Sequence, residues 1–402
     1  MTNALPDHVP AELAKPFALT PRKAQYSNPF TEIIPELHKG PDIFYGTDIF
    51  PGPSGGWVIR RADDLKAVYE NTEDFIKKGN SQFAAMIGED WDVIPTELDP
   101  PVHDAFRKAL NPVFSPKKMA ELQDKVRNRA KFYIDQFKNN GSVDFMKDFA
   151  VPYPVSIVLD MLDLPQDRMP EFLEWEFSLL HTNSMEERAA ATLAVKNMLL
   201  EEIEKREKNP GDDLISTAMT LEVNGRKWNR QEVFGFFFNL FLGGLDTVSA
   251  NLSLHFHHLA THLDHQRTLR EHPEKIENAV QEFLRGYAAV TTMRICKNEF
   301  QLHGVTIKPG DRVAMSTPLG SNDPAVYENP SEIDLDRRPN HLTFGWGIHR
   351  CLGNHLARRE INVAIEEMLK AIPEFTIKPG FEVPFYLSNI IHIPELPLVW
   401  NK

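Results

Sequence analysis

The stretch Phe344-Gly345-Trp346-Gly347-Ile348-His349-Arg350-Cys351-Leu352-Gly353 is the most informative part of this 402-residue sequence. It places three glycines around one cysteine, just before a segment with helical patterning. Glycine allows positive φ and lets backbone N–H groups approach a ligand or a sulfur atom closely. A cysteine at a helix N-terminus faces the positive end of the helix dipole, which favours the thiolate.

The charges near Cys351 favour the thiolate further, since five arginines and no acidic residue occur from Arg337 to Arg359. Three interpretations remain open from the residues alone. Cys351 is a small buried residue in a turn, a catalytic thiol, or a metal-bound thiolate. A catalytic thiol needs a placed base, and His349 and His355 come without the expected oxyanion machinery.

The composition sets the broad class of the protein. Hydrophobic residues make up 42% and charged residues 25%, which is typical of a soluble globular chain. A formal net charge of −13 argues against a general role in binding polyanions. Two cysteines exclude a disulfide framework and a Cys-rich zinc site. The N-terminus lacks secretory features, and the apolar run 233–245 is short for a membrane span, so we expect a cytoplasmic protein.

Hydrophobic periodicity predicts a mainly α protein with a minor β part concentrated near the C-terminus. The predicted segments are an extended surface arm over residues 1–55, a strand at Gly55–Arg61, a helix at Ala62–Lys78, a functional loop at Gly79–Pro101, mostly helices over Val102–Lys208, one long core helix at Gln231–His262, short strands after Arg285, and a helix at Leu352–Leu369. No internal repeat is visible, and Asn224-Gly225 is a two-residue hairpin pattern.

The segment FGWGIHRCLG resembles the haem-binding loop of the cytochrome P450 family, with the pattern F-x-x-G-x-x-x-C-x-G. The resemblance implies a single P450 domain over residues 1–402 that binds haem b. It also implies that Cys351 is the axial ligand of the iron, that Phe344 packs beside the haem, and that Gly345 and Gly353 permit the tight turn.

Two further motifs of the family occur in the expected order. Glu282-Phe283-Leu284-Arg285 matches E-x-x-R and implies a structural buried ion pair of Glu282 and Arg285 with an arginine from Arg337-Arg338. In the long helix, Gly243-Gly244-Leu245-Asp246-Thr247 matches the oxygen-binding segment. By resemblance, Thr247 hydrogen-bonds the oxygen over the haem and Asp246 connects that site to bulk water for proton delivery. Close helix packing is the alternative reason for the two glycines.

The resemblance also suggests residues that bind the haem propionates. His103 and Arg107 follow Asp99-Pro100-Pro101 and share one helix face at i,i+4. Arg294 and His349 match two further propionate contacts of the family. A solvated helix face is the simpler alternative for His103 and Arg107.

Resemblance to the family extends over nearly the whole chain and is strongest to the bacterial branch that contains camphor 5-monooxygenase. It implies electrons from a small acidic [2Fe–2S] ferredoxin with its reductase, docked on the basic stretch 337–359 together with Arg107. Trp91 stands where the camphor enzyme has a tyrosine that binds the substrate ketone, Asn239 replaces an apolar residue, and Thr292 replaces an aspartate. We therefore expect a related terpenoid or norisoprenoid substrate, with Trp91, Leu242, Thr247 and Val290 lining its pocket.

The sequence thus predicts a haem-thiolate monooxygenase that hydroxylates a small hydrophobic molecule with O₂, and binds neither nucleic acid nor membrane. A peroxide-driven peroxygenase is one alternative, although it does not need the Asp246-Thr247 pair. A haem gas sensor is a second alternative, and a helical protein without haem is a third.

Overall fold

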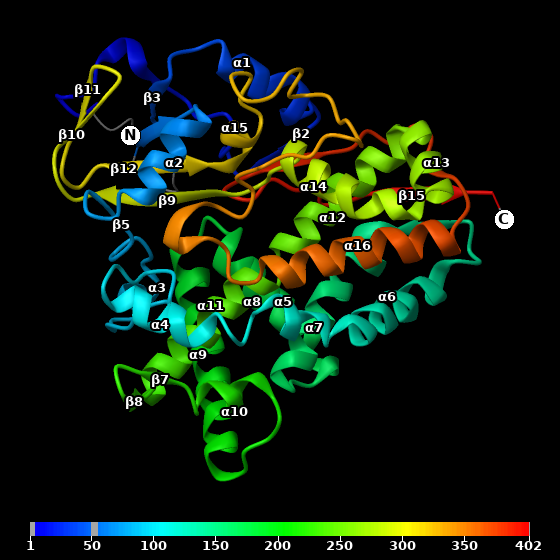
Figure 1. The fold of residues 1–402 in the computed structure, drawn as a ribbon, viewed down its shortest axis with the longest axis horizontal. Coiled ribbons are helices and arrows are strands. Elements are labelled where there is room, and N and C mark those ends of the chain that lie inside the picture. The colour runs from blue at the N-terminus through cyan, green and yellow to red at the C-terminus, as the bar shows by residue number, and fades with distance from the viewer. Residues whose placement is uncertain (1–4, 50–54, 402) are drawn as a thin grey trace. The chain divides into compact units, whose positions relative to one another are not determined.

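The computed structural model describes residues 5–49 and 55–401 (Figure 1). The chain divides into two compact units. Unit 1 comprises residues 1–76, 130–150 and 249–402, and unit 2 comprises residues 77–129 and 151–248. About 50% of the chain is helical and 13% is in strands, so the predicted mainly α fold with a minor β part is confirmed.

Unit 2 is almost entirely helical. Its elements are α3 (Phe83–Met86), α4 (Val102–Leu110), α5 (Pro116–Ala120), the first part of α6 (Gln123–Phe137), α7 (Pro152–Leu162), α8 (Met169–Leu180), α9 (Met185–Lys208), α10 (Leu214–Ala218), β7 (Glu222–Val223), β8 (Arg226–Lys227) and α11 (Arg230–Gly244).

Local sequence explains where several unit 2 elements begin. Asn229 caps α11 in a capping box with Glu232, in which each side chain bonds the other residue's backbone N–H. Ser184 caps α9 by accepting from the Glu187 backbone N–H at 3.2 Å. The predicted hairpin between β7 and β8 is present, with Asn224 and Gly225 at φ 51° and 77°, values that an Asn-Gly turn tolerates well.

Unit 1 contains the sheets. The six-stranded sheet has the order β1-β3-β4-β12-β9-β5, and smaller sheets pair β13-β15-β6, β10-β11 and β14-β2. The strands are β1 (Ala14–Lys15), β2 (Lys23–Gln25), β3 (Ile43–Gly46), β4 (Gly56–Ile59), β5 (Phe75–Ile76), β6 (Ser142–Asp144), β9 (Thr291–Cys296), β10 (Phe300–Leu302), β11 (Val305–Ile307), β12 (Arg312–Ser316), β13 (Phe375–Ile377), β14 (Phe385–Leu387) and β15 (Pro397–Trp400).

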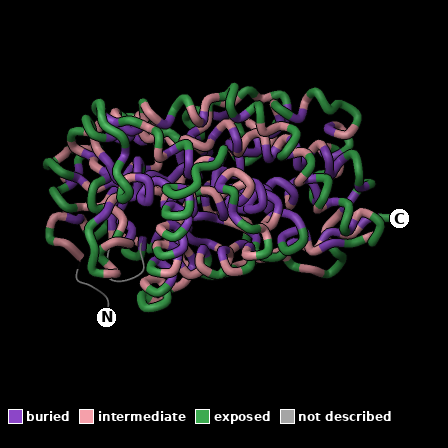
Figure 2. Tube along the Cα trace, turned by 90° about the horizontal axis from the view of Figure 1, so that it is seen from below, coloured by how far each residue is buried: buried purple, intermediate pink, exposed green. Residues whose placement is uncertain are grey.

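Unit 1 also contains helices. They are α1 (Ile34–His38), α2 (Ala62–Glu70), most of α12 (Thr247–Thr261), α13 (Leu263–Glu271), α14 (Ile276–Gly286), α15 (Thr317–Ser321) and α16 (Asn354–Ala371). In β12, Val313 pairs with Trp57 of β4 on one side and with Arg294 of β9 on the other. That register places Arg294 on the strand next to the edge strand β5. Figure 2 shows buried residues along the inner turns of the helices and exposed residues on their outer turns.

Three predicted segments differ from the structure. Residues 5–49 are not a surface arm, because Phe17, Phe30 and Phe44 are at most 2% exposed and β1 and β3 join the main sheet; residues 1–4 and 50–54 of that prediction lie outside the described residues. The helix predicted at Ala62–Lys78 ends at Glu70, because Phe75 pairs with Cys296 as the sheet's edge strand.

The third difference concerns the long helix predicted at Gln231–His262. It is interrupted at Leu245–Asp246, so that α11 ends at Gly244 and α12 begins at Thr247. Counted through this break, residues 230–261 are long and apolar enough to cross a membrane by length and composition alone. However, 61% of the most apolar window is buried within the protein, as in the core helix of a soluble protein.

Candidate functional site

The cysteine loop of unit 1 is held by its own backbone. The Cys351 N–H donates to the Phe344 carbonyl at 2.8 Å, and the Gly345 N–H donates to the Leu342 carbonyl at 2.7 Å. The Asn354 amide, at the start of α16, donates to the Cys351 carbonyl at 2.8 Å. The Cys351 thiol is nevertheless exposed. The loop therefore presents a sulfur atom in a fixed position at the N-terminus of a long helix.

Glycine is required at two positions in this loop, the predicted Gly345 and also Gly347. Gly345 and Gly347 have φ of 70° and 66°, which side chains rarely adopt. A Cβ on Gly347 would also lie 2.9 Å from the Tyr69 carbonyl oxygen. Gly353 differs from the prediction, because its φ is −82° and the turn does not need its flexibility. A Cβ there would meet no described atom within 4 Å.

Positive charge surrounds Cys351. The Arg358 guanidinium lies 4.3 Å from the centre of the Phe344 ring. Burial and the neighbouring charge of Arg350 lower the pKa of Arg358 to about 10, and the charge of Cys351 opposes them. Burial and then Arg358 and Arg350 lower the pKa of His341 to about 3, so this imidazole is neutral at physiological pH. The local field thus favours an anionic sulfur.

Tyr69 links Arg294 to the cysteine loop, and sequence reasoning missed it. The Arg294 guanidinium lies 5.2 Å from the centre of the Tyr69 ring, and the same ring lies beside Gly345. Burial raises the pKa of Tyr69, whereas the charge of Arg294 and a hydrogen bond with Thr292 lower it. The sequence showed Thr292 only as the replacement of an aspartate, and nothing in the sequence indicated its tyrosine partner.

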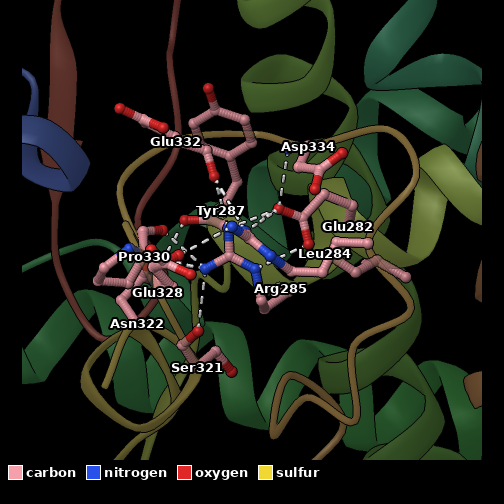
Figure 3. Close-up of polar contacts among 12 residues, drawn as sticks. Glu282, Leu284, Arg285, Tyr287, Ser321, Asn322, Glu328, Pro330, Glu332 and Asp334 are labelled. Carbon is pink, nitrogen blue, oxygen red and sulfur yellow. Dashed lines mark hydrogen bonds and ion pairs between the residues drawn. The ribbon is translucent and has the colours of Figure 1, made fainter. Parts of the chain in front are cut away.

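The ion pair expected from Glu282 and Arg285 is present and fully buried (Figure 3). The Arg285 guanidinium donates twice to the Glu282 carboxylate, at 2.7 and 2.8 Å. Arg337 is the further arginine, and Glu282 also accepts from the Asp334 backbone N–H at 3.2 Å. Arg285 donates as well to the carbonyls of Ser321, Pro330 and Glu332 and to the Asn322 side chain.

This network ties α14 to the segment that precedes the cysteine loop. The Thr343 hydroxyl donates to the Leu284 carbonyl, and the Asn278 amide donates to the carbonyls of Leu335 and Arg337. The ion pair therefore acts as scaffolding for the loop that carries Cys351.

In unit 2, Thr247 is the first residue after the break between α11 and α12. Its hydroxyl donates to the Gly243 carbonyl at 2.9 Å. The two glycines of this segment serve different purposes. Gly244 packs closely, since a Cβ there would lie 3.1 Å from Val158 of α7, whereas Gly243 is exposed and a Cβ on it would meet no described atom within 4 Å. The packing alternative thus explains only Gly244.

Asp246 lies in the same break and contacts a histidine. Nε2 of His181 is 3.1 Å from its Oδ2, and the same nitrogen is 3.6 Å from Oε1 of Glu176. No sequence pattern associates these residues, because His181 and Asp246 are 65 positions apart.

The other predicted residues of unit 2 have mixed outcomes. His103 is buried on α4, with Nδ1 3.2 Å from Asp104, and burial lowers its pKa. Arg107 lies in the last turn of the same helix. Trp91 does not offer its indole N–H to a ligand, because this group donates to Glu89 at 2.9 Å and the ring packs edge-on against Phe234 and Phe238.

Two residues of α11 that the sequence singled out, Asn239 and Leu242, have partly exposed side chains. The Thr96 hydroxyl donates to Oδ1 of Asn239 at 2.9 Å, and Asn239 and Leu242 are only partly buried, unlike the buried run 233–238 of the same helix. In unit 1, Val290 is also partly buried, and its carbonyl accepts from Thr317.

Comparison with known proteins identifies the fold and the family. The family model for cytochrome P450 matches residues 154–384. A probable cytochrome P450 127A1 from Sinorhizobium fredii is 38% identical over 99% of this chain and 97% of that relative. The chain belongs to the cytochrome P450 family. P450s are monooxygenases that bind haem b through a cysteine thiolate.

Solved structures agree with this assignment. The crystal structure of the P450 CYP101C1 matches this P450 with a TM-score of 0.88 and 32% identity, covering 99% of this chain and all of the other. The crystal structure of CYP101J2 matches with a TM-score of 0.89 and 29% identity, covering 100% of both chains. The resemblance to the bacterial P450s is confirmed.

The residues of this P450 fit a haem. The donor set at the cysteine loop is one exposed sulfur, fixed by backbone hydrogen bonds in a positive field. Gly353 lies next to it with no described atom within 4 Å of an added Cβ, so a flat macrocycle could approach the backbone there. Arg294, which lies on the neighbouring sheet, has a cationic group that can pair with a carboxylate of the haem.

Proposed function

We propose that Cys351 is the axial iron ligand of this P450 and that the enzyme hydroxylates a small hydrophobic molecule. The observation that carries the proposal is the exposed Cys351 thiol in a rigid loop, at the N-terminus of α16 and beside Arg350 and Arg358. The helix dipole and both arginines stabilise a thiolate. Bound haem supplies the chemistry that reduces O₂ and inserts one oxygen atom into a C–H bond.

The side chains seat the cofactor and handle protons. Phe344, His349 and Gly353 belong to the cysteine loop, and we assign them to contact with the macrocycle. Arg294, His103, Arg107 and His349 are the cationic or hydrogen-bonding groups for its two propionates. Thr247 offers a hydroxyl whose proton is directed to the Gly243 carbonyl, so its oxygen can accept a further hydrogen bond. Asp246 passes on the protons that this chemistry consumes.

We propose a terpenoid or norisoprenoid ketone of camphor-like size as substrate. The likeness to CYP101C1 and CYP101J2, which belong to the camphor-like branch, supports this proposal. Trp91 is a packing residue in this proposal, since its N–H already donates to Glu89. The Asn239 amide, supported by Thr96, is the polar group for a substrate carbonyl, and Leu242 and Val290 supply apolar surface.

An acidic [2Fe–2S] ferredoxin with its reductase is the proposed electron donor. The stretch 337–359 carries five arginines and no acid in a chain of net charge −13. Arg338 and Arg350 are exposed within it, and Arg350 adjoins Cys351. A basic face near the iron ligand favours an acidic partner. We propose a cytoplasmic enzyme, and one P450 domain over 1–402, since the family match 154–384 runs through both units.

Cys351→Ser tests the ligand assignment. We expect the variant to lose the ferrous–CO absorption band near the red edge of the Soret region, because an alcohol does not replace the thiolate. Cys296→Ser is the matched control, since Cys296 is buried in β9 and donates to the Asn298 carbonyl. Survival of the band in Cys351→Ser, or its loss in the control alone, would contradict the proposal.

A further inference from the structure

Three titratable side chains meet at the break between α11 and α12. Glu176 lies on α8, His181 directly follows that helix, and Asp246 lies in the break itself. Nε2 of His181 is the common contact, 3.1 Å from Asp246 and 3.6 Å from Glu176. The three side chains are 9%, 6% and 12% exposed, so their charges are poorly solvated.

Glu176 occupies a place where an apolar residue is expected. Phe172, Glu176 and Leu179 form the buried stripe of α8 at helical spacing. His181 and Asp246 already make a complete ion pair, so a second buried carboxylate adds a desolvation cost without completing a pair. An apolar side chain at position 176 would give a more favourable free energy of folding. This points to a chemical reason for the carboxylate.

The geometry determines how many protons the three groups hold. Nε2 carries at most one hydrogen, and its shorter contact directs that hydrogen to Asp246. A distance of 3.6 Å exceeds a good hydrogen bond, so the charge of a Glu176 anion would be poorly compensated. The arrangement is therefore an anionic Asp246, a cationic His181 and a Glu176 that keeps its proton.

The pKa shifts of Glu176 and His181 agree with these protonation states. Burial and the charge of Asp246 raise the pKa of Glu176, and the contact with His181 opposes them. Burial would lower the pKa of His181, but the hydrogen bond and charge of Asp246, together with the contact with Glu176, outweigh it and raise the pKa to about 10. On α9, Arg188 donates to the Thr182 carbonyl and Glu187 accepts from the Thr182 hydroxyl, which fixes the residue after His181.

We infer that Glu176 and His181 form the proton supply of Asp246. The Nε2–H bond of His181 breaks as an O–H bond forms on Asp246. A rotation of the Glu176 side chain then closes the 3.6 Å separation to hydrogen-bond distance, and the O–H bond of Glu176 breaks as Nε2–H re-forms. The Glu176 carboxylate takes a proton from solvent in turn. One proton moves from solvent to Asp246, and no electrons are exchanged.

This inference rests on the proposed role of Asp246 in proton delivery. Glu176 and His181 act through Asp246 and are positioning residues rather than catalytic ones. Because Glu176 and His181 act in series, the double variant is expected to lose no more turnover than either single variant.

The test uses the haem-loaded enzyme with a bacterial [2Fe–2S] ferredoxin, its reductase, NADH and camphor as probe substrate. Glu176→Gln, His181→Gln and the double variant are compared with Glu174→Gln, an exposed position on the same helix. The readouts are turnover from pH 6 to 9, the solvent deuterium isotope effect and camphor binding by spin shift. Each single variant should slow turnover about tenfold with a raised isotope effect, unchanged camphor binding and a deficit that grows with pH.

The outcomes separate this inference from the proposed function. A double variant as active as the single ones supports a chain of two groups. If Asp246→Asn is slow but Glu176→Gln and His181→Gln match Glu174→Gln, the proton supply is refuted and the role of Asp246 stands. If Asp246→Asn is fully active, both fail. A pH-independent loss that follows a lowered melting temperature would show a merely structural role and overturn the inference.

Discussion

The two buried charge clusters of this P450 differ in how completely their charges are paired. In unit 1, the Glu282–Arg285 pair is joined by Arg337 and by backbone carbonyls, so each donor and acceptor of the pair meets a partner. In unit 2, Glu176 and Asp246 share one imidazole nitrogen of His181. The comparison teaches that a fully bonded buried charge serves as scaffold, whereas an excess carboxylate leaves a proton that can move.

Replacing each buried glutamate by its isosteric amide tests whether the two clusters differ in this way. Glu282→Gln leaves Arg285 buried without its counter-charge and is expected to lower the free energy of unfolding by about 3–5 kcal/mol. Glu176→Gln replaces a group that is neutral only in the folded protein, so it removes the cost of protonating that group at neutral pH and should leave stability unchanged or raise it. Urea unfolding of both variants measures the difference.

Equal losses in the two variants would refute the distinction. If Glu282→Gln yields no folded protein, Arg337→Gln provides a milder form, because it removes one partner of Glu282 at a position that is 19% exposed. That variant should still be less stable than Glu176→Gln.

The pH dependence of stability sharpens the comparison further. His181 has a pKa of about 10 in the folded protein, above its ordinary 6.5, so the stability it contributes is full below pH 6.5 and is lost as pH rises towards 10. The raised pKa of Glu176 acts in the same direction. Wild type should lose a few kcal/mol between pH 6.5 and 10. His181→Gln should show a flatter profile by urea unfolding, and parallel profiles would contradict the assigned charges.

The smallest effect is expected at a single charged hydrogen bond outside both clusters. Trp91→Phe removes the indole donor to Glu89, which also contacts Lys196, and should cost about 1 kcal/mol. The spin shift with camphor-like ketones should stay unchanged, because Trp91 is assigned to packing. A lost spin shift would return Trp91 to the substrate contacts and displace Asn239.

Much of the core of the site could be predicted because its motifs are local. The loop from Phe344 to Gly353 carries its own turn, cysteine and helix start within ten positions. The pair Glu282 and Arg285 lies one helical turn apart, so the spacing alone places both side chains on one face. Short-range patterns of this kind depend on backbone geometry that the residues impose themselves.

The failed predictions depend on distant partners. Phe75 fits a helical pattern in the sequence, but in the structure it belongs to a strand and pairs with Cys296. The N-terminal residues resemble a surface arm in the sequence because β1 and β3 are only two and four residues long, and they join the main sheet through β4, whose other partner is the distant β12.

The sequence alone determined the cysteine loop, the E-x-x-R pair and the family, since each rests on residues close together in the chain. Only the tertiary structure decided which arginine joins Glu282, which tyrosine supports Arg294, and that His181 and Glu176 stand beside Asp246. The reason is that burial, shared hydrogens and charge compensation are properties of neighbours in space, which the chain brings together only when it packs.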